Sequence, residues 1–116
     1  MKKIYAALVV ILVSVLLTYC TSSKKSQATE NAGKISYTEN MQPIISANCS
    51  PCHFPPKGTK LALDNYGAAK TNIDDIISRI NKNPSEKGFM PFKHEKLSDS
   101  TIQLFVKWKN DGLIEK

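Results

Sequence analysis

The first apolar stretch of the chain, residues 4–17, is almost continuous and is interrupted only by Tyr5 and Ser14. Two lysines, Lys2 and Lys3, stand just before it. The run is shorter than the roughly 18–20 residues that a membrane-spanning helix needs, and a positive start followed by a short apolar core is typical of an export signal. We therefore expect residues 1–19 to be a signal peptide.

Farther along, apolar residues recur at helical spacing. The best-marked stripe consists of four isoleucines at positions i, i+3, i+4 and i+7: Ile73, Ile76, Ile77 and Ile80. Thr71 or Asn72 can cap the start of this helix, and Pro84 ends it.

A second stripe predicts a C-terminal helix with four buried residues: Ile102, Phe105, Val106 and Trp108. Ser98 is its expected N-cap, and Gly112 is the expected residue just after its end. We expect Trp108 to be an ordinary core residue, to lie at the crossing of this helix with the first one, or to lie near the edge of a bound cofactor.

A first helix is expected before Cys49, starting between Thr38 and Gln42, with Pro43 in its first turn. Between Cys49 and the isoleucine stripe the pattern predicts a loop with little regular structure. Leu61 and Leu63 alternate with polar neighbours, so that both face one way. Tyr66 is expected to be either a packed loop aromatic or a wall of the site.

The segment between the apolar run and the first helix is polar and aperiodic. Residues 20–33 are therefore expected to be a flexible tether, and residues 34–116 the folded domain. The whole chain of 116 residues carries a net charge of +6. A domain of this size has a small core and often needs a disulfide, a metal or a cofactor to stabilise it.

The end of the export signal, Leu17-Thr18-Tyr19-Cys20, resembles a bacterial lipobox, in which cleavage leaves a lipidated cysteine as the first residue. Tyr19 departs from the pattern, because the residue before the cysteine is usually small. The expected lipid carrier is Cys20; an uncleaved anchor and ordinary signal cleavage are the alternatives. All three place the domain outside the cytoplasm, where covalent haem and disulfides both form.

The sequence Cys49-Ser50-Pro51-Cys52-His53 is a C-x-x-C-H motif, typical of c-type haem attachment. Its two thiols add across the vinyl groups of the porphyrin, and the histidine that follows ligates the iron. The alternatives are a thioredoxin-type redox pair, a zinc site and a plain disulfide. The first needs a strand–helix–strand context that no strong pattern supplies here. Zinc would need a fourth ligand, for which His94 is the only other histidine.

The region from Ile35 to Leu113 resembles a single-haem class I cytochrome c domain. Besides the haem motif, four segments carry the resemblance: Met41 to Asn48, Leu61 to Tyr66, Phe89-Met90-Pro91, and Lys96-Leu97-Ser98 with the helix that follows. The resemblance implies a small all-α fold of three to four helices wrapped around one covalently attached haem c. It also implies electron transfer as the activity.

The iron needs a second axial ligand, and the chain offers few. Met41 lies on the approach to the haem motif and cannot easily reach the opposite face of the ring. Met90 stands in a loop between two helices, with Gly88 before it and Pro91 after it. Met90 is the expected ligand; His94 or an open, water-bound site is the alternative.

An iron with both axial positions filled by His53 and Met90 has no vacancy for a substrate, which favours an electron carrier over an enzyme. One alternative is a haem protein with a labile Met90, acting as a ligand sensor or a peroxidase-like enzyme. Another is a thiol–disulfide oxidoreductase that uses Cys49 and Cys52.

The expected partners are redox proteins with an acidic docking surface, because lysines flank the expected haem edge in two loops: Lys57, Lys60, Lys87, Lys93 and Lys96. The expected location is extracytoplasmic, at the membrane through the lipid on Cys20. No nucleic-acid partner is expected.

Overall fold

The computed structural model describes residues 33–58 and 60–116. The expected signal peptide, the lipidation site Cys20 and the tether as far as residue 32 lie outside the described residues. Within the described part the chain is helical and forms no strand, so the expected all-α class is confirmed at that level. One isolated parallel bridge pairs Ser36 with Ile114.

The first helical segment starts one residue earlier than expected. It opens as a short π-helix, η1 (Tyr37–Met41), and continues directly as α3 (Gln42–Cys49) with Pro43 in its first turn. The side chain of Ser36 caps η1 by accepting a hydrogen bond from the Glu39 backbone N–H. The haem motif therefore begins on the last residue of a helix, as expected.

A further helix, α4 (Tyr66–Thr71), occupies part of the segment that was expected to be a loop, and this expectation was wrong. The Asn65 side chain caps it, because its Oδ1 accepts a hydrogen bond from the Ala68 backbone N–H at 2.9 Å. This cap and the high helix propensity of Ala68 and Ala69 are enough for about one and a half turns, although Gly67 has a low helix propensity.

The isoleucine stripe forms α5 (Ile73–Ile80), as predicted, with Ile73, Ile76 and Ile80 buried and Ile77 half-buried. Asn72 precedes it, but the Asn72 side chain does not cap α5. It donates instead to the carbonyl oxygen of Ala68 at 2.8 Å, which joins α4 to α5.

The last helix, α6 (Asp99–Asn110), has the predicted ends. The Ser98 hydroxyl accepts a hydrogen bond from the Thr101 backbone N–H at 3.2 Å, and Gly112 takes a positive φ of 97° just beyond the helix. Its buried residues are Ile102, Phe105 and Trp108. Val106 is only half-buried, which corrects its predicted place in the core.

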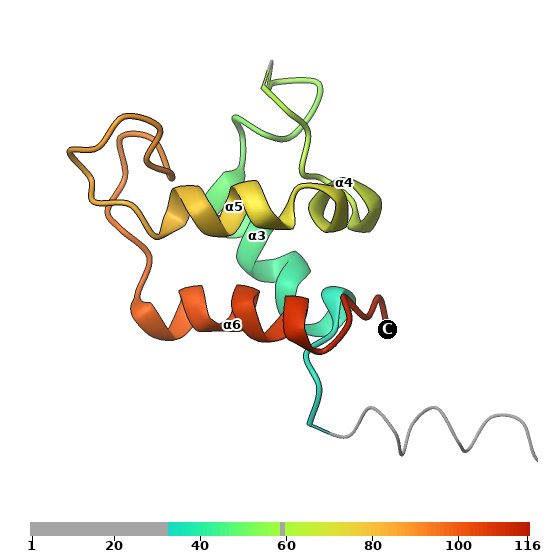
Figure 1. The fold of residues 1–116 in the computed structure, drawn as a ribbon. Coiled ribbons are helices and arrows are strands. Elements are labelled where there is room, and N and C mark those ends of the chain that lie inside the picture. Colours follow the sequence, from blue (N-terminus) through green and yellow to red (C-terminus); the bar gives the residue numbers. More distant parts are fainter. Residues whose placement is uncertain (1–32, 59) are drawn as a thin grey trace, which may run out of the picture. The chain divides into compact units, whose positions relative to one another are not determined.

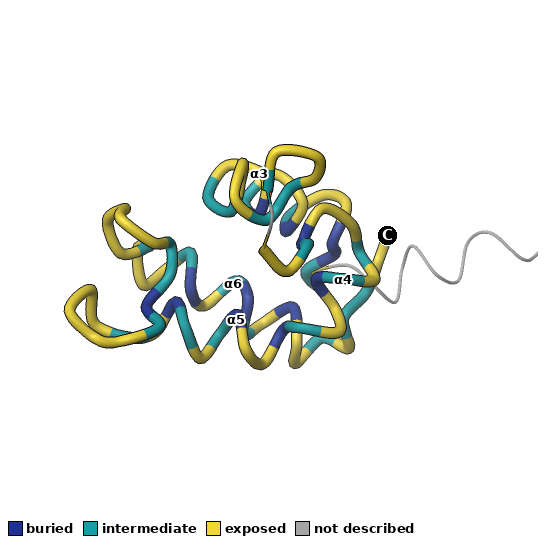
Figure 2. Tube along the Cα trace, turned by 90° about the horizontal axis from the view of Figure 1, so that it is seen from above, coloured by how far each residue is buried: buried dark blue, intermediate teal, exposed yellow. Residues whose placement is uncertain are grey.

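Helices α5 and α6 contact each other and run antiparallel, and the segment of residues 81–98 joins them at one end (Figure 1). η1 contacts both α3 and α6. The core between these elements consists of eleven residues: Tyr37, Met41, Ile45, Leu63, Ala69, Ile73, Ile76, Ile80, Ile102, Phe105 and Trp108. Buried and exposed positions alternate along α5 and α6, whereas the connecting loops are largely exposed (Figure 2).

Candidate functional site

A cavity of about 620 Å³ opens between the haem motif, α5 and the segment that joins α5 to α6. Its volume falls within the range of about 300–1,000 Å³ that is usual for small-molecule and cofactor sites. Its buried walls are apolar and come from three elements: Leu63, Ile76, Ile80 and Phe105. Walls of this kind suit a largely apolar ligand.

All four residues predicted to hold a haem line this one cavity: Cys49, Cys52, His53 and Met90. The first three belong to the motif at the end of α3, and Met90 comes from the distant segment between α5 and α6. Folding thus brings two thiols, an imidazole and a thioether to the wall of the same space. His94 also lines the cavity, although its side chain is exposed.

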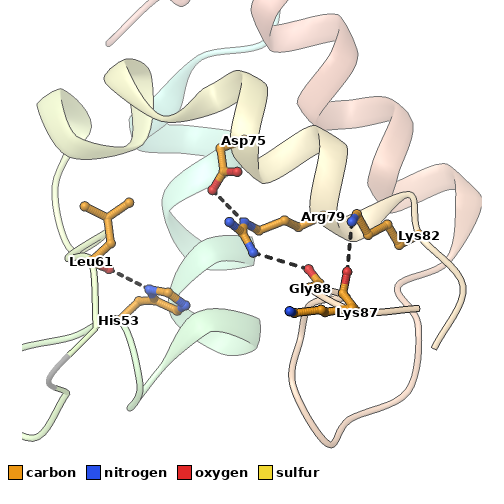
Figure 3. Close-up of polar contacts among 7 residues, drawn as sticks. All are labelled: His53, Leu61, Asp75, Arg79, Lys82, Lys87 and Gly88. Atoms are coloured by element: carbon orange, nitrogen blue, oxygen red, sulfur yellow. Dashed lines mark hydrogen bonds and ion pairs between the residues drawn. The ribbon is translucent and has the colours of Figure 1, made fainter. Parts of the chain in front are cut away.

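The His53 ring is oriented by the loop that follows the motif. Its Nδ1 lies 2.5 Å from the Leu61 carbonyl oxygen (Figure 3). A carbonyl oxygen only accepts hydrogen bonds, so Nδ1 carries the proton and the lone pair stays on Nε2. The His53 carbonyl oxygen also accepts from the Leu63 backbone N–H at 2.9 Å, which holds the same loop from its other side. This geometry prepares Nε2 as a metal ligand.

Gly58 allows the loop after the motif to fold back on Cys52. A Cβ at this position would lie 2.6 Å from the Pro51 carbonyl oxygen and closer still to that of Cys52. Such contacts are too short for any side chain, so only glycine fits here without a shift of the backbone. Sequence reasoning missed this residue, because the close approach exists only in three dimensions.

The two cysteine thiols differ in their surroundings. Cys49 is half-buried and Cys52 is exposed, and both are free in the described structure. Burial raises the pKa of the Cys49 thiol to about 11. This thiol is therefore protonated at neutral pH in the folded chain.

Met41 and Met90 lie in different environments. Met41 is completely buried in the core, and it is absent from the described residues that line the cavity. Met90 is half-buried on the cavity wall, and its backbone N–H donates to the Arg79 carbonyl oxygen at 3.3 Å. The expectation that Met41 does not reach the site agrees with this geometry.

Four aromatic or apolar residues that the sequence associated with the site have separate outcomes. Leu61 and Leu63 both line the cavity, as expected. Tyr66 does not: its hydroxyl donates to the Leu113 carbonyl oxygen at 2.8 Å, which agrees with a packed aromatic and not with the alternative of a wall of the site. Trp108 lies in the core, where its ring centroid is 5.8 Å from that of Tyr37 on η1, which is the helix-crossing alternative.

The cavity also has a charged wall, which sequence reasoning missed. Asp75 and Arg79 line it from α5, and Arg79 Nε donates to Asp75 Oδ2 at 2.7 Å (Figure 3). The hydrogen bond and charge of Asp75 raise the pKa of Arg79. The i, i+4 spacing of the pair is visible in the sequence, beside the isoleucine stripe, and would have indicated it.

Among the described residues, no three His, Cys, Asp or Glu side chains gather closely enough to hold a metal ion by themselves. None of the described helices combines the length and the apolar composition needed to cross a bilayer.

Comparison with known proteins identified no relative: no protein-family model matches the chain, and neither a curated protein nor a solved structure does.

Proposed function

We propose that this chain is an extracytoplasmic electron carrier with a cytochrome c fold around one covalently bound haem c. In this proposal Cys49 and Cys52 hold the haem as thioethers, and His53 and Met90 are the axial ligands of its iron. The haem would supply reversible one-electron exchange, and the protein would supply attachment, ligation and a shielded environment.

The observation that carries the proposal is that Cys49, Cys52, His53 and Met90 line one cavity of about 620 Å³. The motif alone predicts attachment, but it says nothing about where a second ligand comes from. Met90 reaches the same space from a segment that is far away in the sequence, whereas Met41 is buried elsewhere in the core. The donor set of one imidazole and one thioether is that of cytochromes with a raised reduction potential.

The cavity walls support electron transfer rather than catalysis. Leu63, Ile76 and Phe105 are buried apolar side chains that exclude water from the site. An apolar environment disfavours the additional positive charge of ferric iron and so holds the reduction potential up. With both axial positions filled, no substrate reaches the iron.

The geometry of His53, with the proton on Nδ1 and the lone pair on Nε2, gives this side chain a defined role in the proposed ligation. The Leu61 carbonyl oxygen holds the proton on Nδ1 and fixes the plane of the ring. Nε2 is then free to bind without losing a proton first. Replacing the hydrogen bond with water would leave the ring freer to rotate and the ligand less basic.

The thiol–disulfide alternative has less support. An attacking cysteine of that class works as a thiolate, and its pKa is lowered by its surroundings. Burial acts in the opposite direction here, because it raises the pKa of Cys49 to about 11. The described part of the chain also lacks the strands on which the thioredoxin-type motif stands.

We further propose that acidic redox proteins dock at the mouth of the cavity. Five lysines of the two flanking loops have exposed side chains: Lys57, Lys60, Lys87, Lys93 and Lys96. Steering by such charges accelerates association at low salt and is screened beyond about 8–10 Å near physiological ionic strength. Electron-transfer rates with an acidic partner should therefore fall as salt is added; unchanged rates would remove this docking mode.

The membrane location is proposed from Cys20 and the preceding signal. If Cys20 carries lipid, the protein should fractionate with membranes, and Cys20→Ala should release it or block its processing. Normal processing and unchanged membrane binding of Cys20→Ala would instead favour an uncleaved anchor.

The central proposal is tested by exporting the full chain in bacteria that attach c-type haem. Intact mass and the visible spectrum after denaturation should show one covalently bound haem. The double variant Cys49→Ala, Cys52→Ala should lose it, whereas Cys20→Ala should retain it as the matched cysteine control. A wild-type chain that is exported but carries no covalent haem would refute the proposal.

A further inference from the structure

The segment of residues 83–97, which carries Met90, packs on the core through Met90 and Leu97, and its hydrogen bonds to the rest of the described structure converge on one place. All the hydrogen bonds that leave this segment end at the C-terminal turn of α5 or just beyond it. Their partners there are Arg79, Asn81 and Lys82. The polar attachment that positions the backbone around Met90 is therefore the one at the end of α5.

Arg79 makes the two attachments closest to Met90. Its backbone carbonyl oxygen accepts from the Met90 N–H at 3.3 Å, and its Nη1 donates to the Gly88 carbonyl oxygen at 3.5 Å. The two bonds bracket Phe89, whose side chain is buried. Arg79 thus contacts the backbone of Gly88 and of Met90, the two residues that flank Phe89. In Figure 3 the Arg79 side chain extends from α5 to this segment.

The guanidinium is held in place from the other side by Asp75, one turn earlier on α5. Arg79 Nε donates to Asp75 Oδ2 at 2.7 Å. Gly88 adopts a positive φ of 86°, and a Cβ there would lie 3.3 Å from Arg79 Nη1, so the guanidinium packs directly on the Gly88 backbone. A planar guanidinium reaches two acceptors in a fixed geometry, which a lysine ammonium does not.

We propose that Arg79 is a positioning residue that holds Met90 on the cavity wall and so sets how firmly the iron site is closed. This inference rests on the proposed haem ligation. A ligand on a loose segment is in its binding-competent place for a smaller fraction of the time, and its apparent affinity falls by that fraction. Arg79 then governs the competition between Met90 and small external ligands.

The test uses the haem-loaded full chain. Arg79→Ala should keep its covalent haem but bind carbon monoxide about fivefold more tightly in the ferrous form, the change expected for the loss of one ordinary hydrogen bond that helps to hold the competing ligand. The sulfur-to-iron charge-transfer absorption of the ferric form should weaken. Arg79→Lys should show the same changes in carbon monoxide affinity and in charge-transfer absorption as Arg79→Ala. The positive charge of a lysine does not by itself bridge Asp75 and Gly88.

Lys82→Ala is the matched control. Lys82 Nζ donates to the Lys87 carbonyl oxygen at 2.9 Å, on the same segment, but Lys82 does not line the cavity. Its carbon monoxide affinity should stay within about twofold of wild type, since its bond is farther from Met90. If Lys82→Ala raises the carbon monoxide affinity as much as Arg79→Ala does, the segment as a whole positions Met90, and the specific role of Arg79 is overturned.

Amide hydrogen exchange of residues 87–92 gives a readout that needs no haem. In Arg79→Ala exchange there should be about fivefold faster, while α6 stays unchanged. If the chain proves to lack haem and exchange still accelerates, the proposed function fails and the positioning role stands. If haem is attached and both exchange and carbon monoxide binding match wild type, the positioning role fails alone.

Discussion

The two ends of the described domain are held together in different ways. At one end, the Ile114 carbonyl oxygen accepts two hydrogen bonds. One comes from the Tyr37 N–H, far away in the sequence, at 2.8 Å, and the other from the side chain of the nearby Trp108, through Nε1, at 2.9 Å. Three aromatic rings pack there with centroids 5.6–6.4 Å apart, those of Tyr37, Tyr66 and Trp108.

At the other end, helices α3, α5 and α6 form part of the cavity wall, and the rest of the wall comes from loops that are mostly exposed. Cys52, His94 and Phe92 are exposed, and the side chain of Phe92 is 65% accessible to solvent. The comparison teaches that one end is held by packed aromatic rings and backbone hydrogen bonds, while the donor atoms are collected at the end with more exposed loops, which we call the looser end. Elements of low local stability are where binding residues are usually placed.

The largest effect is expected at the aromatic end. Trp108→Ala should lower the free energy of unfolding by about 3–5 kcal/mol, because a fully buried indole and its hydrogen bond to Ile114 are both lost. Denaturant unfolding measures this change. Trp108→Phe is the control and should cost about 1–2 kcal/mol, since it keeps most of the buried area. A loss below about 1 kcal/mol for Trp108→Ala would contradict the comparison.

Substitution of Met41 and of Met90 is expected to affect different properties: the stability of the fold in the first case and the ligation of the iron in the second. Met41 is completely buried in the core, so Met41→Ala should lower the free energy of unfolding by about 2–5 kcal/mol. The haem spectrum and reduction potential of this variant should match those of wild type. A changed axial ligand in Met41→Ala would show that our division of the molecule is wrong.

Met90→Ala should behave in the opposite way. The haem should stay attached, but the potential should fall by at least ~0.1 V, within the span of about 0.8 V that axial ligands control, and carbon monoxide should bind. Redox titration and ligand-binding spectra measure both effects. His94→Ala is the needed control, because His94 lines the same cavity and would mask the loss of Met90 by replacing it. Should His94→Ala alone remove the low-spin spectrum, the iron is ligated by two histidines.

Gly58→Ala probes how tightly the looser end is packed against the haem motif. The added Cβ would meet the backbone of Pro51 and Cys52, so we expect a loss of about 1–3 kcal/mol in the free energy of unfolding, with lower yield of attached haem. Gly67→Ala is the matched control, because its Cβ would meet only Asn65 Oδ1, at 3.4 Å. Equal effects of the two substitutions would contradict the close approach at Gly58.

The smallest expected effect concerns acid. Asp111 accepts a hydrogen bond from Lys107 Nζ and another from the Ile35 N–H, at 2.8 and 2.7 Å, and these partners lower its pKa. A carboxylate whose pKa is lower in the folded state stabilises the fold above its unfolded value, and that stability is lost as pH falls through the folded value. Asp111→Asn should therefore be less stable than wild type at neutral pH, with the difference shrinking below about pH 4. A difference that is independent of pH would exclude this linkage.

The sequence by itself determined the features that depend on neighbouring residues. Ile73 to Ile80 form a helix because their spacing repeats with its turn, Ser98 and Gly112 mark the ends of α6 by local hydrogen bonding and backbone freedom, and the haem motif is contiguous. The short α4 was missed, although its cap Asn65 is a local signal, because six residues carry too little periodicity to outweigh the loop pattern around them.

Only the tertiary structure decided which side chains meet across the chain. In the folded chain the Tyr66 hydroxyl is hydrogen-bonded to Leu113 and Tyr66 does not line the cavity. The Trp108 ring packs on Tyr37, and Gly58 lies against the backbone of Cys52. The tertiary structure also brought Arg79 to the segment of Met90. Some of these contacts, such as that of Tyr66 with Leu113, join residues that are far apart in sequence, and even Gly58 and Cys52 are not neighbours along the chain. All of them follow from the packing of helices and loops on one core. No local pattern of apolar and polar residues encodes a contact of that kind.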